Sequence, residues 1–134
     1  MKNLDHVLNS APARWTLAIG WTLLLTLFLL QPEADPLIDL GLPRGESTVQ
    51  RELFFSALHL LAFAMTCFIW FWATCRALSP GRSLLAAVLI AIALGIVTET
   101  LQSLTLDRHA SPVDLIANVA GALVAARVIW QRYI

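Results

Sequence analysis

Four long apolar segments constrain the fold of this chain more than any other feature of its sequence. A helix needs about 20 mostly apolar residues to cross the hydrocarbon core of a bilayer. The segments cover residues 15–31, 53–75, 83–104 and 113–130. Because unpaired backbone groups cannot face lipid, each segment is expected to be helical throughout. The sequence therefore predicts an all-α fold, a four-helix transmembrane bundle formed as one membrane domain over residues 1–134.

Composition supports a membrane protein and weakens other classes. Of 134 residues, 58% are hydrophobic and 13% are charged, whereas about a quarter of a soluble domain is charged. The net charge is zero, so nucleic-acid binding has no electrostatic support. Cys67 and Cys75 lack CxxC spacing, and no nucleotide, zincin or hydrolase motif occurs, so no metal or cofactor is expected. The first segment is expected to be a retained helix, because QPEADP offers no cleavage site of a signal peptide.

The distribution of basic residues predicts the orientation of the bundle. Lysine and arginine are enriched on the cytoplasmic side of membrane proteins. One side has six of them (Lys2, Arg14, Arg76, Arg82, Arg127 and Arg132) and the other has three (Arg44, Arg51 and Arg108). Both termini are therefore expected in the cytoplasm, with the loop at 32–52 and the turn at 105–112 outside.

A polar stretch, TETLQSLTLDRHASPVDLIANVAG at 98–121, joins the third and fourth segments. Glu99 and Gln102 share one helix face, as do Asp114 and Asn118 on the next helix. The short connection predicts an antiparallel hairpin. At 1.5 Å per residue, Glu99 lies about 8 Å and Asn118 about 9 Å from this connection, and His59 lies roughly 10 Å into the second segment. Three helices are therefore expected to bring polar groups to one level near the outer surface.

Each polar residue also has a structural interpretation. Ser111-Pro112-Val113-Asp114 has the form of a helix start, so Asp114 can cap its helix, act in a site, or do both. Arg108 can be solvated, pair with Asp107, or belong to the site. The histidine and the two amides can serve as interhelical hydrogen-bond partners alone. Glu99 fits packing least well, because an ionised carboxylate inside a membrane helix must be neutralised, paired or hydrated.

The candidate roles follow from these positions. The catalytic candidates are Glu99, His59 and Asp114; the substrate-binding candidates are Arg108, Gln102 and Asn118; the helix-packing candidates are Gly95, Gly121 and Ser111. Gly121 shares the face of Asp114 and Asn118, where the third and fourth segments are expected to touch. No residue is assigned as a metal ligand.

One pattern unites most of these residues. Glu99-x-x-Gln102, Arg108, Ser111, Asp114, Asn118 and Gly121, with His59 before Ala62-Phe63, resemble the VanZ-like family of small bacterial multi-pass membrane proteins over about the last eighty residues. The resemblance implies a four-helix domain in the bacterial plasma membrane and a role in the cell envelope. The family's name-giving member is associated with low-level resistance to the antibiotic teicoplanin, which acts on cell-wall precursors. The family often has an acidic and a basic residue three to four positions before the histidine, where this chain has Phe55 and Ser56.

Three functions remain open at this point. The first is an outer-leaflet site that binds, and in one version modifies, the headgroup of a lipid or lipid-linked cell-wall intermediate. In that site Arg108 would hold phosphate, Glu99 and His59 would exchange protons, Asp114 would orient the histidine, and the two amides would position the substrate. The second is a non-catalytic protein whose polar cluster only fixes helix packing or a partner interface. A proton-coupled transporter ranks last, because the inner segments LLAAVLIAIAL and GALVAA carry no polar group. Binding and catalysis are not separated, and the oligomeric state is not predicted.

The predicted orientation can be tested by cysteine accessibility. A cysteine introduced at Gly45 should react with a membrane-impermeant thiol reagent added to intact cells. A cysteine at Ser79 should react only after the membrane is permeabilised, because basic residues flank the second connection and place it in the cytoplasm. The unsubstituted protein, with Cys67 and Cys75, is the control. The reverse labelling pattern would place the polar stretch at the inner leaflet.

Overall fold

The described part of the chain folds as four helices. The computed structural model describes residues 10–31, 48–104 and 112–134. Its helices are α2 (Ala11–Leu30), α3 (Val49–Thr74), α4 (Pro80–Ser103) and α5 (Pro112–Tyr133), and no strand occurs within those ranges. All four are long and apolar enough to cross a membrane. The prediction of an all-α bundle with four transmembrane helices is confirmed.

The helices extend beyond the apolar segments that predicted them, most clearly at their starts. The helix α2 begins at Ala11, where Ser10 Oγ accepts a hydrogen bond from Ala13 N at 3.4 Å. The helix α3 begins at Val49, where Thr48 Oγ1 accepts from Arg51 N at 3.3 Å. Such caps satisfy amide groups that have no partner inside the helix. Hydropathy alone missed these turns because their polar residues resemble loop sequence.

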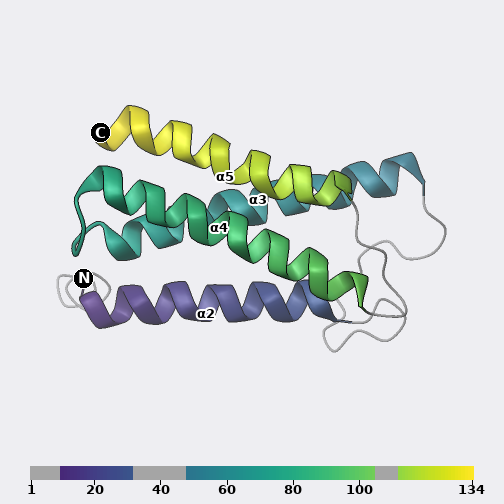
Figure 1. Cartoon of the computed structure of the whole chain (residues 1–134), viewed down its shortest axis with the longest axis horizontal. Helices are drawn as coiled ribbons and strands as arrows, with labels where there is room; N and C mark the ends of the chain where they lie inside the picture. The colour runs from purple at the N-terminus through teal and green to yellow at the C-terminus, as the bar shows by residue number, and fades with distance from the viewer. Residues whose placement is uncertain (1–9, 32–47, 105–111) are drawn as a thin grey trace, which may run out of the picture.

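Consecutive helices run antiparallel, so α3 and α5 begin at the same end of the bundle, and α3 contacts each of the others (Figure 1). The helices α2 and α5 both contact α3, and α4 contacts each of the other three described helices. The start of α2 and the end of α5 lie at the same end of the bundle (Figure 1). This arrangement agrees with both termini on one side of the membrane. Which side that is remains a prediction.

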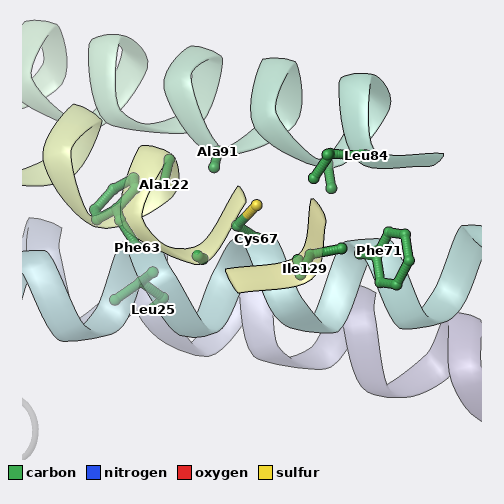
Figure 2. Packing of buried hydrophobic residues seen from close by; sticks show 10 residues of the cluster. Leu25, Phe63, Cys67, Phe71, Leu84, Ala91, Ala122 and Ile129 are labelled. Atoms are coloured by element: carbon green, nitrogen blue, oxygen red, sulfur yellow. The ribbon is translucent and has the colours of Figure 1, made fainter. Parts of the chain in front are cut away.

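The core pairs large side chains with alanines (Figure 2). Phe63, Phe71 and Ile129 are buried among the small residues of α4 and α5, including Ala91 and Ala122. Between membrane helices, association depends on close packing and hydrogen bonds rather than on removal of apolar surface from water. The small residues let the helix backbones approach, while many large apolar side chains remain on the outer, lipid-facing surface.

Two reciprocal hydrogen bonds join α2 to α3. Trp21 Nε1 donates to Thr66 Oγ1 at 2.9 Å, and Trp70 Nε1 donates to Thr22 Oγ1 at 3.0 Å. Each threonine hydroxyl also donates to the carbonyl four residues earlier in its own helix, at 2.8 Å. Both hydroxyls are therefore donor and acceptor at once, so the buried indole N–H groups have partners in a region without water.

The helices α3 and α5 approach closely at Gly121. A Cβ added to Gly121 would overlap the carbonyl oxygen of Leu60 and lie 2.9 Å from its carbonyl carbon. The close contact of Gly121 is therefore with α3, whereas the sequence suggested a contact with the neighbouring hairpin helix, α4. At Gly95, a Cβ would lie 3.2 Å from Asn118 Cβ and 3.3 Å from Phe63 Cε1. Ser111, the third packing candidate, lies outside the described residues.

Gly121→Ala should destabilise the bundle by about 1–3 kcal/mol, because the added methyl group meets backbone that has to move. Gly20→Ala is the matched control, since a Cβ there has nothing within 4 Å. That control should be neutral or stabilise by up to about 1 kcal/mol, because alanine is the better helix former. Thermal unfolding in detergent compares the two. Equal stability of both variants would contradict the close α3–α5 approach.

Candidate functional site

The predicted polar residues gather at one end of the bundle, where α3 and α5 begin and α4 ends (Figure 1). His59 is 8% exposed, Glu99 6% and Asn118 1%, although each comes from a different helix. Gln102 is also buried, and Asp114 is half-buried nearer the helix start. Three helices thus contribute buried polar groups to this end, and the roles of these groups stay predictions. Arg108 lies outside the described residues.

A buried hydrogen bond joins the histidine of α3 to the amide of α5. His59 Nδ1 lies 2.9 Å from Asn118 Oδ1. With the amide oxygen as acceptor, Nδ1 is the donor of this hydrogen bond. The ring of Phe63, one turn further along α3, lies parallel to the imidazole with centroids 6.5 Å apart. Both contacts restrict the orientation of His59.

The same asparagine has a second polar group that the protein does not use. Asn118 Nδ2 is buried and has no hydrogen-bond partner among the described residues. A buried amide donor without a partner costs free energy, so such groups are rare unless a water molecule or ligand completes them. Gly95 leaves room for this amide, because a Cβ at that position would lie 3.4 Å from Nδ2. A side chain at position 95 would therefore press against Asn118 and Phe63, and the glycine lets the amide pack close to α4.

Asp114 contacts a serine rather than the histidine. Ser56 Oγ donates to Asp114 Oδ1 at 3.1 Å, which is a second polar link between α3 and α5. The sequence interpretation had Asp114 orienting His59, and the structure gives that contact to Asn118 instead. Asn118 lies one helical turn deeper than Asp114, and His59 lies one turn deeper than Ser56, so each polar side chain of α5 meets the polar side chain of α3 at its own level.

Gln102 ties α4 to α2. Its Nε2 donates to the carbonyl oxygen of Leu29 at 2.7 Å, in the last turn of α2. The last carbonyls of a helix have no partner within it, so this contact satisfies one of them. Gln102 was predicted to position a substrate, and this contact gives it a structural task as well. Glu99, one turn before it, is buried on the same side of α4.

Sequence reasoning missed two members of this region. Ser56 is three residues before His59, which places both on one face of α3, and this spacing could have identified it. The Leu29 carbonyl could not have been identified, because a backbone group carries no sequence signal. Among the described residues, no group of three or more His, Cys, Asp or Glu side chains could hold a metal ion.

The fold and its side chains define a multi-pass membrane protein with an interhelical cluster of polar residues at one end. The family model described as VanZ/LLP1 matches residues 9–132. The chain therefore belongs to the VanZ/LLP1 family, and the match covers all four helices rather than only the last eighty residues. No curated protein and no solved structure matches the chain significantly.

The hydrogen bond between His59 and Asn118 should appear as coupling in a double-mutant cycle. His59→Ala and Asn118→Ala should each lower the stability in detergent, and together they should lose about 1 kcal/mol less than the sum. Thr100→Ala is the control partner for His59, because its exposed hydroxyl donates only to Ile96 of its own helix. Additive losses for His59 and Asn118 would argue that the two side chains do not interact.

Proposed function

We propose that this VanZ/LLP1 protein binds the polar headgroup of a lipid or a lipid-linked cell-wall intermediate at the outer leaflet. The observation that carries the proposal is the buried Asn118 amide, whose Nδ2 has no partner among the described residues while its Oδ1 holds His59. A headgroup hydroxyl or phosphate oxygen is a suitable acceptor for this donor. The buried Glu99 on α4 supports the same interpretation, because packing alone does not require a carboxyl group there.

The roles in such a site follow from chemistry. Arg108 would hold an anionic group by paired N–H donors, a task for which guanidinium is suited. His59 would accept a proton at Nε2 and Glu99 would donate or accept one, which is the pairing that general acid–base chemistry uses. Asp114 would act through Ser56 and the start of α5 rather than on the histidine. Binding of the headgroup requires only the anion contact of Arg108, whereas modification of the headgroup also requires the proton transfers of His59 and Glu99.

A second function is favoured by a different observation. The described polar contacts of His59, Ser56 and Gln102 all join one helix to another. Such contacts stabilise membrane bundles by about 0.6–2 kcal/mol each. In this alternative the cluster is structural, and the protein serves as a packing or interaction module in the cell envelope.

Three variants separate the two functions. For a site, Glu99→Gln should preserve abundance and stability while removing activity by about 100-fold or more, because the amide keeps shape and hydrogen bonding but cannot exchange protons. Arg108→Lys should weaken activity, since a point charge replaces a two-pronged donor. For a structural cluster, Glu99→Gln should be neutral or stabilising, and Asp114→Ala should be the damaging change through the loss of a contact near the helix start.

The measurements are protein abundance, thermal stability in detergent, and teicoplanin susceptibility of cells that express each variant. Thr100→Val is the matched control, because Thr100 is adjacent to Glu99 but exposed on the outer face of α4. It should leave all three measurements unchanged. Full activity of the Glu99→Gln protein would end the acid–base part of the proposal.

A further inference from the structure

A groove of about 520 Å³ lies at the opposite end of the bundle from the polar cluster. Its lining residues come from all four described helices. They lie toward the end of the bundle where α2 begins and α5 ends, which Figure 1 shows. The lining includes Arg14 and Leu17 of α2, Phe68, Ile69 and Trp72 of α3, and Tyr133 of α5. None of these residues belongs to the candidate site described above.

The groove is lined mostly by apolar and aromatic side chains, and its one charged residue, Arg14, lies near the outer end. Arg14 and Trp72 lie within the terminal turns of their helices, whereas Leu17 and Phe68 lie about 9 Å from the helix ends at 1.5 Å per residue. The bilayer has the same gradient at its surface, where headgroups give way to hydrocarbon. A ligand that fits the groove therefore has a polar head and an aliphatic chain, which is the form of a membrane lipid.

The cation at the mouth of the groove is held in a defined orientation. Arg14 Nη1 donates to the Trp72 carbonyl oxygen at 2.8 Å, and the guanidinium lies 4.4 Å from the centroid of the Trp72 ring. Arg14 is only 6% exposed although it lines the groove. A phosphate would add a charge-assisted contact to those that already hold the side chain.

The charges of the surrounding helix ends favour an anionic ligand. The arginines within about two turns of this end are Arg14, Arg76, Arg82, Arg127 and Arg132. The acidic residues in the described part of the chain are Glu52, Glu99 and Asp114, and all three lie toward the other end. Positive potential near a membrane surface attracts anionic lipids and falls off within about 10 Å at 0.1 M salt.

We propose that this groove is a binding site for an anionic glycerophospholipid, with the upper part of one acyl chain against Leu17 and Phe68 and the phosphate at Arg14. The lipid lies in the leaflet that the chain termini face. It is distinct from the headgroup ligand of the polar cluster, which is bound at the other end of the same helices. The site stabilises the α2–α3 contact, because the lipid joins the two helices where Arg14 already links them.

Native mass spectrometry of the delipidated full-length protein tests the proposal. Palmitoyl-oleoyl phosphatidylglycerol and phosphatidylcholine, which share their acyl chains, are added separately and the retained lipid is counted. The wild-type protein should retain phosphatidylglycerol about tenfold more strongly, and Arg14→Gln should lose that preference. Leu17→Trp fills the groove from an exposed position and leaves Arg14 intact, so it should lose the lipid without loss of fold. Arg127→Gln removes an exposed charge outside the groove lining and should retain the wild-type preference.

Several results would overturn the proposal. Equal retention of the two lipids, or equal effects of Arg14→Gln and Arg127→Gln, would show that only diffuse charge acts at this end. A dimer that Leu17→Trp dissociates would assign the groove to a second copy of the chain. If the protein retains lipid only after residues 1–9 are removed, the groove of the full-length protein is occupied by that segment and not by a lipid. Binding of phosphatidylglycerol that Leu17→Trp leaves unchanged would place the lipid elsewhere.

Discussion

The close approach of α3 and α5 is the contact on which the rest of this structure depends. Gly121 lies against the backbone at Leu60, at a distance that no side chain larger than hydrogen allows. Leu60 follows His59 in the chain, and Asn118 lies one turn before Gly121, so the glycine contact also sets the separation of the two polar side chains. Their 2.9 Å hydrogen bond is possible because the two backbones are this close. A packing residue and a site residue thus depend on the same interface.

The polar groups at the two ends of the bundle differ in how completely their hydrogen bonds are satisfied. In the middle of the bundle and toward the start of α2, two tryptophan–threonine pairs join α2 to α3, and each indole N–H in them has a hydrogen-bond acceptor. At the other end, Asn118 keeps a donor that the described residues do not use. In a medium without water, fully paired groups stabilise and partly paired groups are costly. This difference supports the proposal that the polar cluster binds a ligand, whereas the tryptophan–threonine pairs only hold α2 against α3.

Much of the fold could be predicted because the membrane restricts the choices. Span length, helix type and the antiparallel order follow from hydropathy and short connections, and so does the level shared by His59, Glu99 and Asn118. The partners of individual side chains could not be predicted. Gly121 was expected to pack against the third apolar segment, which is α4, but it packs against α3. Helix periodicity identifies which face of a helix is packed but not which neighbouring helix packs there. For the same reason Asn118, rather than Asp114, contacts the histidine. The helix starts were missed because polar first turns have loop-like composition.

The central claim is that the cluster of His59, Glu99 and Asn118 receives a headgroup rather than only joining helices. The most direct measurement is the identification, by mass spectrometry, of the lipids and cell-wall precursors that copurify with the wild-type protein and with Glu99→Gln, at matched yield and stability. A site predicts a polar-headgroup species that is enriched on the wild-type protein and lost from the variant. The same lipid profile on both proteins would contradict the account and leave the cluster as helix packing.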